Sequence, residues 1–338
     1  MAPEIESAPA TPPAARHTAR VSMAVVAELA GVSGQTVSRV VNGSPRVDPH
    51  TRARVEQAMA QLGYRPHRAA RALRTGRTQV IGLVVTTLTT FGNSRMLQAT
   101  AEAAAERGYA IVLMTASNGV TAAFNTLIEQ EVDGVVVLNE ASAQIATTAL
   151  PHGLRLVVID APATADVTAV HSDHAGGAFA ATTHLLERGY STVHHLAGPD
   201  GSFAATERER GWREALASAG VSAPPVVRGD WSAESGYAAG AQLQAAPAVF
   251  CANDQMALGL LRALATRGLV VPTQVGVVGF DDVPDAANYL PPLTTIRQDF
   301  AALAHRAVDA LISDIEGAGG PPSASVVPAT LVERESTR

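Results

Sequence analysis

The stretch MAVVAELAGVSGQTVSRVVN, residues 23–42, decides how the amino-terminal part of the chain folds. Apolar residues recur at helical spacing on both sides of Gly31, so the stretch predicts two short helices separated by a tight turn. Ser33 suits the N-cap of the second helix. The apolar stripes contain Val25, Val26, Leu29 and Ala30 in the first helix and Val37, Val40 and Val41 in the second.

The polar residues of the second helix carry the functional signal. They present an amide, two hydroxyls and a guanidinium, in the order Gln35, Thr36, Ser38 and Arg39. A short rigid rod with such groups is what a reader of the DNA major groove offers to base edges. Many unrelated helix pairs share a glycine turn, so the polar face, rather than the turn, favours a DNA-binding helix-turn-helix.

A third helix completes this small unit. Asp48-Pro49 supplies an N-cap and a first-turn proline, and the helix is predicted to run to about Leu62 and to stop at Gly63. Residues 64–77, which follow, are dense in arginine. Three helices in some forty residues suffice for a small but marginal DNA-binding headpiece.

The charge of the chain is unevenly distributed. Residues 16–77 contain eleven arginines and three acidic residues, a formal charge of +8, and the net charge of −6 leaves −14 for the rest. A positively charged segment in an otherwise acidic protein is typical of electrostatic binding to DNA. A merely solvated basic surface is the alternative, which the coincidence of the arginines with the helix-turn-helix disfavours.

Composition excludes several classes of protein. All basic residues are arginine, so a P-loop lysine or a Schiff-base lysine is impossible. Cys251 is the only cysteine, which excludes intrachain disulfides and thiolate zinc clusters and fits a reducing cytoplasm. Residues 1–19 are rich in proline and alanine and lack the apolar segment of a signal peptide, so we expect a disordered tail. No apolar run approaches membrane-spanning length, and we expect no membrane partner.

From residue 79 the pattern changes to short β-branched runs that alternate with alanine-rich helical stretches. The runs are QVIGLVV, AIVLM, GVVVL, LVVID, VHHL, AVFCA and VGVVGF. The predicted helices lie near residues 95–107, 122–131, 175–188, 206–219, 232–244 and 255–267. This alternation favours parallel sheets covered on both faces. Breaks near residues 168–177 and 290–300 divide the series into two Rossmann-like lobes.

Ligands of such folds bind beyond the carboxyl ends of strands, and here also between the lobes. The polar and aromatic residues at these places are Asp160, Arg208, Trp231, Asn253, Asp281 and Gln298. Carboxylates, amides and guanidinium groups engage vicinal hydroxyls, and an indole stacks on the apolar face of a pyranose. The set therefore indicates a sugar site. The alternatives are capping turns for the two aspartates, a surface ion pair for the arginine, a core role for the tryptophan and an N-cap role for the asparagine.

The sequence gives no support for a metal site or a catalytic site. The histidine pairs His171/His174 and His194/His195 lack the spacing of a metal site with a third ligand. The sequence contains no G-x-S-x-G, H-E-x-x-H or G-x-G-x-x-G motif. We therefore expect no metal, no cofactor and no enzymatic activity.

The chain resembles the lactose/galactose repressor (LacI/GalR) family. VAELAGVSGQTVSRVVNGSPRV, TRARVEQAMAQLGYRP and RAARALRTGRTQVIGLVV are similar to its headpiece and hinge. AGP, RGW, GDWSAESG, ANDQMALG, VVGFDD and PPLTTIRQDF are very similar to its lactose-repressor branch. The resemblance spans residues 21–333. It implies a headpiece at 20–64, a hinge at 65–78 and a periplasmic-binding-protein-like core at 79–338, which binds effector and dimerises.

The resemblance assigns roles within the DNA-binding part. It implies that residues 33–42 are the recognition helix and that Gln35 and Arg39 read bases. The other residues assigned to DNA binding are Ser33 and Gly34, at the start of the helix, and Arg68 and Leu73, in the hinge. Thr36, Ser38 and Asn42 would contact phosphates or stabilise the fold. The family further implies that residues 67–73 fold into a helix on the operator and that Leu73 wedges into the minor groove. An exposed linker whose leucine packs on the core is the alternative. Gly34 departs from relatives with an aromatic residue there, which leaves the operator sequence open.

By the same match, the six strand-end residues named above fall on inducer-binding positions. The loop at residues 86–94 and Ala204 depart from the lactose-repressor branch, which leaves the aglycone or second sugar open. The expected protein is a cytoplasmic, homodimeric transcriptional repressor of a pseudo-palindromic operator, controlled by a sugar, with a galactoside as the first choice. A different sugar or a corepressor ligand is the alternative within regulation. A solute receptor and a sugar-processing enzyme are the alternatives outside it.

Overall fold

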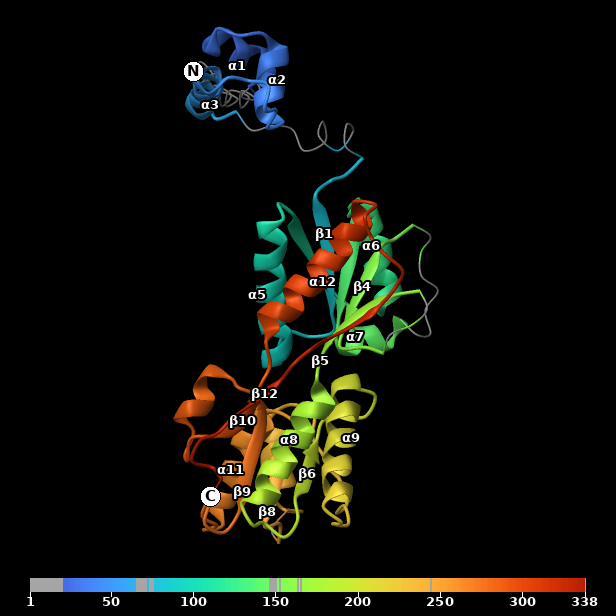
Figure 1. Cartoon of the computed structure of the whole chain (residues 1–338), viewed down its shortest axis with the longest axis vertical. Helices are drawn as coiled ribbons and strands as arrows, with labels where there is room; N and C mark the ends of the chain where they lie inside the picture. The colour runs from blue at the N-terminus through green and yellow to red at the C-terminus, as the bar shows by residue number, and fades with distance from the viewer. Residues whose placement is uncertain are drawn as a thin grey trace, which may run out of the picture. The chain divides into compact units, whose positions relative to one another are not determined.

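The computed structural model describes residues 21–64, 72, 76–145, 151, 153–162, 164, 166–243 and 245–337 (Figure 1). Internal contacts divide the chain into two units, Met1–Gly76 and Arg77–Arg338. The predicted hinge contacts Arg68 and Leu73 and the predicted tail at 1–19 lie outside the described residues.

The described part of the first unit is a headpiece of three helices: α1 (Met23–Ala30), α2 (Gly34–Val41) and α3 (Pro49–Leu62). The boundaries for which a cap or turn residue was predicted have the predicted chemistry. The Ser33 side chain accepts the backbone N–H of Thr36, and Asp48 accepts that of Thr51. Gly31 and Gly63 end α1 and α3 in the left-handed conformation, which glycine adopts without strain. The three predicted helices are therefore confirmed.

One detail of the headpiece core was predicted wrongly. The apolar stripe of α1 was expected to contain Val25 and Leu29, but these residues are 43% and 51% exposed. The helix buries Val26, Ala27 and Ala30 instead. Alanine on the packed face lets α1 lie close to α2 and α3, and this rotates the two larger residues toward solvent.

The first lobe of the second unit is a six-stranded sheet with the order β11-β5-β4-β3-β1-β2, and all its neighbours are parallel. Its strands are β1 (Val80–Val85), β2 (Ala110–Thr115), β3 (Gly134–Leu138), β4 (Leu156–Ile159), β5 (Thr168–Ser172) and β11 (Ala324–Val327). One face is covered by α5 (Phe91–Glu106) and α12 (Phe300–Ile315), the other by α6 (Val120–Glu129) and the short α7 (Glu140–Ala143).

The second lobe has the order β12-β10-β9-β8-β6-β7, parallel except for β12 against β10. Its strands are β6 (His194–Ala197), β7 (Val227–Arg228), β8 (Ala248–Cys251), β9 (Gly276–Asp281), β10 (Thr294–Arg297) and β12 (Thr330–Val332). One face is covered by α8 (His174–Glu187) and α9 (Phe203–Ser218), the other by α10 (Ala233–Ala239) and α11 (Asp254–Thr266). A 3₁₀ turn, Pro284–Asn288, follows β9.

The chain crosses between the lobes three times (Figure 1). It passes from β5 to α8, returns from β10 to α12, and passes again from β11 to β12. The first two crossings lie at the predicted breaks, whereas the third was not predicted. The predicted fold class, a helical headpiece with two Rossmann-like lobes, is confirmed. Because both sheets are essentially parallel, the carboxyl ends of their strands gather at one edge of each lobe.

Candidate functional site

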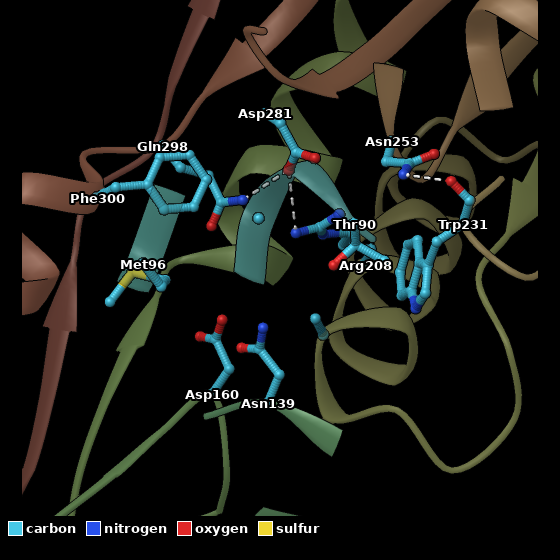
Figure 2. A pocket seen from close by; sticks show the side chains of 12 residues that line it. Thr90, Met96, Asn139, Asp160, Arg208, Trp231, Asn253, Asp281, Gln298 and Phe300 are labelled. Atoms are coloured by element: carbon cyan, nitrogen blue, oxygen red, sulfur yellow. Dashed lines mark hydrogen bonds and ion pairs between the residues drawn. The ribbon is translucent and has the colours of Figure 1, made fainter. Parts of the chain in front are cut away.

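A cleft between the two lobes brings the six predicted residues together (Figure 2). Each of the six occupies the end of a strand, or the helix or loop that follows one. The cleft is lined by Thr90, Gly92, Met96, Asn139, Asp160, Ala204, Arg208, Trp231, Asn253, Asp281, Gln298 and Phe300. Carboxylates, amides, one guanidinium and aromatic rings thus alternate around a single space, which suits an uncharged ligand with many hydroxyls.

Arg208 is the charged centre of the cleft. The residue is 4% exposed, so the surface ion pair considered from the sequence is wrong. Its Nη2 lies 3.6 Å from Oδ1 of Asp281, and its Nη1 donates to the carbonyl of Ala252. The guanidinium carbon lies 3.8 Å from the ring centroid of Phe280 and 5.5 Å from that of Trp231. Ion pairing and cation–π contact together fix the guanidinium plane.

Asp281 and Gln298 form the second polar group. Gln298 donates from Nε2 to Oδ1 of Asp281 at 2.7 Å, and the Ser172 hydroxyl donates to Oε1 of Gln298 at 2.6 Å. Burial raises the pKa of Asp281 to about 6, although Arg208 and the Gln298 hydrogen bond act in the opposite direction. This carboxyl is therefore poised to donate as well as accept hydrogen bonds near neutral pH.

Asp160 supplies the carboxylate of the first lobe. Its Oδ1 accepts the backbone N–H of Ser172 at 3.3 Å and lies 2.8 Å from Nε2 of His174. Burial alone raises the pKa of Asp160, but His174 and Arg208 outweigh this effect and the pKa lies below its ordinary value. The carboxylate is charged at neutral pH and does not cap a helix, so the capping alternative fails at this position.

Asn253 combines the two roles considered from the sequence. Its Oδ1 caps α11 by accepting the backbone N–H of Met256 at 2.9 Å, while the residue also lines the cleft. Its Nδ2 donates to the backbone carbonyl of Trp231 at 3.0 Å. The cap therefore orients the amide, and the amide fixes the loop that carries the indole.

Trp231 is partly buried rather than a core residue. Gly198 allows its position, because a Cβ there would lie 2.3 Å from Cη2 of the indole. The indole forms part of the cleft wall, beside the Arg208 guanidinium (Figure 2).

Four residues of the cleft have backbone conformations that L-amino acids rarely adopt. The φ angles are +46° at Asn139, +54° at Asp160, +74° at Trp231 and +114° at Asp281. Non-glycine residues in this region carry strain, and such strain concentrates at binding and catalytic sites. The conformations turn side chains at strand ends into the cleft, which supports a ligand site at this place.

The sequence interpretation missed Asn139, which directly follows β3. The available signal was the rule applied to Asp160: a polar residue immediately after an apolar run. Asn139 donates from Nδ2 to Oδ1 of Asn93, while its own Oδ1 is buried and accepts no hydrogen bond from the described residues. A ligand hydroxyl would satisfy that oxygen. Also missed were Thr90, Met96 and Phe300.

The headpiece places the predicted reading residues on one helix. Gln35 and Arg39 are exposed on α2, four residues apart and hence on one face. Ser33 and Thr36 bond to each other at the start of the helix, and Asn42 bonds to the carbonyl and hydroxyl of Ser38 near its end. The side chains of these four residues thus form hydrogen bonds within the helix, whereas the Gln35 amide and the Arg39 guanidinium remain available to a partner.

Gly34, the first residue of α2, has open space around it. A Cβ built there meets no atom within 4 Å. Packing around the backbone therefore does not require glycine at this position.

Among the described residues, no group of three or more His, Cys, Asp or Glu side chains is arranged to hold a metal ion. In the same part of the chain, every helix is too short or too polar to cross a membrane. The exposed helix-turn-helix and the polar cleft together define a ligand-responsive DNA-binding regulator.

Comparison with known proteins identifies the family. A family model for bacterial regulatory proteins of the lacI family matches residues 22–67, and one for a periplasmic binding protein-like domain matches residues 182–337. The lactose operon repressor of Escherichia coli strain K12 is 35% identical, covering 94% of this chain and 91% of that protein. The HTH-type transcriptional regulator CelR of Thermobifida fusca is 36% identical, covering 94% and 98%.

Solved structures of similar proteins indicate the same family. The lac repressor dimer bound to operator and the anti-inducer ONPF has a TM-score of 0.82 at 34% identity, covering 94% of this chain and 99% of that chain. The CelR–cellobiose complex has a TM-score of 0.70 at 33% identity, covering 94% and 100%. The chain belongs to the LacI family of DNA-binding transcriptional regulators. Membership confirms the expected repressor-type regulator and the expectation that the chain is not an enzyme.

Proposed function

We propose that the chain is a homodimeric, cytoplasmic repressor whose operator affinity is controlled by a sugar bound between the core lobes. The headpiece at 20–64 binds DNA, the segment at 65–78 is the hinge, and the core at 79–338 holds the sugar and the dimer contacts. Two headpieces on one pseudo-palindromic operator need two-fold symmetry, which a dimer provides.

One observation carries the proposal: the cleft draws its polar groups from both lobes. Asp160 belongs to the first lobe and Arg208 and Asp281 to the second. A sugar that binds all three favours one relative orientation of the lobes over others. Ligand binding therefore shifts the equilibrium between lobe arrangements by its differential affinity for them. We infer that the shifted arrangement disfavours the operator complex, which makes the sugar an inducer.

A galactoside is the first effector to test, because the sequence resemblance implies inducer-binding roles of the lactose-repressor branch for the six cleft residues. Cellobiose is the second, because CelR, a relative of similar identity, was solved with cellobiose. Calorimetry of the full-length protein with methyl β-galactoside, lactose, cellobiose and ribose ranks these sugars. Heat from cellobiose or ribose but none from either galactoside would reject the galactoside proposal.

Footprinting and gel shifts test the regulatory part. The dimer is expected to protect a pseudo-palindromic site, and the sugar found by calorimetry is expected to release it. Stronger protection with sugar would make the ligand a corepressor. A dimer that discriminates no palindromic duplex from random duplex would reject the proposed function. Turnover of an aryl galactoside would instead indicate a sugar-processing enzyme.

Within the recognition helix, we propose that Gln35 and Arg39 read bases. Ser33, Gly34, Thr36, Ser38 and Asn42 support the helix or approach phosphates. In the hinge, we propose a phosphate contact for Arg68 and a minor-groove wedge for Leu73. A Leu73→Ala variant with unchanged DNA bending would reject the wedge.

A further inference from the structure

His174 lies between the two charged groups of the cleft. It is the first residue of α8, immediately after the first crossing between the lobes, and it is 1% exposed. Its Nε2 lies 2.8 Å from Oδ1 of Asp160 in the first lobe. Its Nδ1 lies 3.3 Å from both Nε and Nη2 of Arg208 in the second lobe. One imidazole therefore contacts a ligand-binding group of each lobe.

The identity of these neighbours determines the protonation state of the ring. A guanidinium has only N–H donors, so the two contacts of Arg208 require a lone pair on Nδ1. The proton of a neutral ring must then be on Nε2, where it is donated to the Asp160 carboxylate. Protonation of Nδ1 would remove both hydrogen bonds and place two cations in contact. The geometry thus requires neutral His174 in the Nε2–H form.

The surroundings of the ring also favour its neutral form. The charged and titratable groups around it are Asp160 after β4, His171 on β5, and Glu207 and Arg208 on α9. The rings of Phe203 and Phe280 lie 6.2 Å and 5.9 Å from it, centroid to centroid, and help to exclude water. Burial lowers the pKa of His174, although Asp160 opposes this effect.

We propose that neutral His174 is a positioning residue, which holds Asp160 and Arg208 in the geometry that binds sugar and ties the two lobes together across the first crossing. The inference deepens the proposed function and rests on it. Because a neutral sugar does not titrate, loss of affinity in acid reports on protein groups alone. Two groups contribute: Asp281, whose pKa is about 6, and, in stronger acid, His174, whose pKa is lowered by burial and whose protonation repels Arg208.

Two variants of the full-length protein test the inference by calorimetry with methyl β-galactoside, or with cellobiose if only cellobiose binds the parent. His174→Leu removes both hydrogen bonds and is expected to weaken sugar binding by about tenfold or more. His174→Gln keeps an amide donor and acceptor but cannot titrate. It is expected to bind within about threefold of the parent, because it supplies a neutral donor and a neutral acceptor in place of the ring.

His305→Leu and His305→Gln are matched controls, because His305 is an exposed histidine on α12, outside the cleft. Both are expected to keep the affinity and the pH profile of the parent. Operator binding and melting temperature establish that each variant is folded. If His174→Leu does not fold, His174→Gln carries the test. A His174→Leu variant with parental affinity, or a His174→Gln variant that binds sugar as weakly as His174→Leu, would overturn the inference.

A second measurement does not depend on sugar. Nitrogen-15 NMR of the ligand-free protein, with the signal assigned by its absence in His174→Gln, is expected to show a neutral ring protonated at Nε2 near neutral pH. A charged ring or the Nδ1–H form would overturn the inference even if sugar binds. If no sugar binds the parent protein, the proposed function is wrong. The NMR measurement still tests the protonation state of His174 in that case.

Discussion

The two polar surfaces of this chain hold their functional side chains in different ways. On α2, Gln35 and Arg39 are exposed, and neither side chain makes a hydrogen bond or ion pair to another described residue. In the cleft, Arg208 and Asp281 are buried and paired before any ligand arrives. DNA is a charged partner that supplies its own field, so long mobile side chains suffice there. A neutral sugar needs charges that are already in place, because it cannot assemble them itself.

The largest effect that this contrast predicts is on Arg208. Arg208→Ala leaves the buried Asp281 carboxyl without its cation, and removal of one partner of a buried pair costs about 3–5 kcal/mol. Sugar binding is expected to disappear from calorimetry while operator binding persists. Arg210→Ala, on the exposed side of the same helix, is the matched control and should leave sugar affinity unchanged. Loss of operator binding in Arg208→Ala would mean that the headpiece and core are not independent.

The next largest expected effect is on the stability of the core in acid. Burial lowers the pKa of His195 to about 4, so below about pH 6.5 the unfolded chain takes up a proton that the folded core refuses. Stability is expected to fall between about pH 6.5 and about pH 4, by about 3 kcal/mol from this group. His195→Phe keeps a ring beside Phe250 and should remove that part of the loss.

Urea unfolding at several pH values, followed by tryptophan fluorescence, measures the slope. Trp212, which contacts His195, and Trp231 are the two tryptophans of the sequence, and both report on the second lobe. Asp281 acts in the opposite direction, because its raised pKa stabilises the folded state in acid. The informative quantity is therefore the difference between variant and parent. An identical slope in both would contradict the assignment of the buried neutral ring.

The reading helix should show a smaller, sequence-specific effect. Arg39→Ala is expected to cost about 1–3 kcal/mol at one base pair and to relax the preference there. Arg46→Ala, an exposed headpiece arginine outside α2, should weaken binding evenly across sequences. Gel shifts on single-base operator variants distinguish the two. An unchanged preference in Arg39→Ala would reject direct readout by this residue.

The smallest predicted effect concerns the start of the reading helix. Ser33→Ala removes the N-cap hydrogen bond of α2 and should reduce headpiece stability by about 1 kcal/mol. Ser22, at the N-cap of α1, makes no such bond, so Ser22→Ala should have little effect. Thermal unfolding that follows the headpiece transition compares them. Equal losses in both variants would show that the cap contributes nothing specific.

Local chemistry made much of the fold predictable. Caps such as Ser33 and Asp48 and apolar runs such as GVVVL act over a few residues, so their consequences can be read from a short window. The same holds for Asp160 and Asp281, which were expected in the cleft because they end buried strands. The predicted helix at 232–244 proved shorter, since α10 ends at Ala239.

What could not be read locally depends on partners far away in the chain. The third crossing places the neighbouring strands β11 and β12 in different lobes, and no short window contains that information. The role of His174 is similar, since its two bonding partners lie 14 and 34 residues away. The exposure of Val25 and Leu29 was missed because helical spacing identifies apolar residues but not the size of those that a neighbour accepts.

The three crossings have a consequence for synthesis on the ribosome. Neither lobe is a contiguous piece of chain, because α12 and β11 of the first lobe follow nearly all of the second. A nascent chain that has emerged only to residue 299 lacks the helix that covers half of one face of its first sheet. The headpiece is complete more than two hundred residues earlier. DNA-reading helices therefore exist in the cell before the element that controls them is finished, and translational pausing late in the message would prolong that interval.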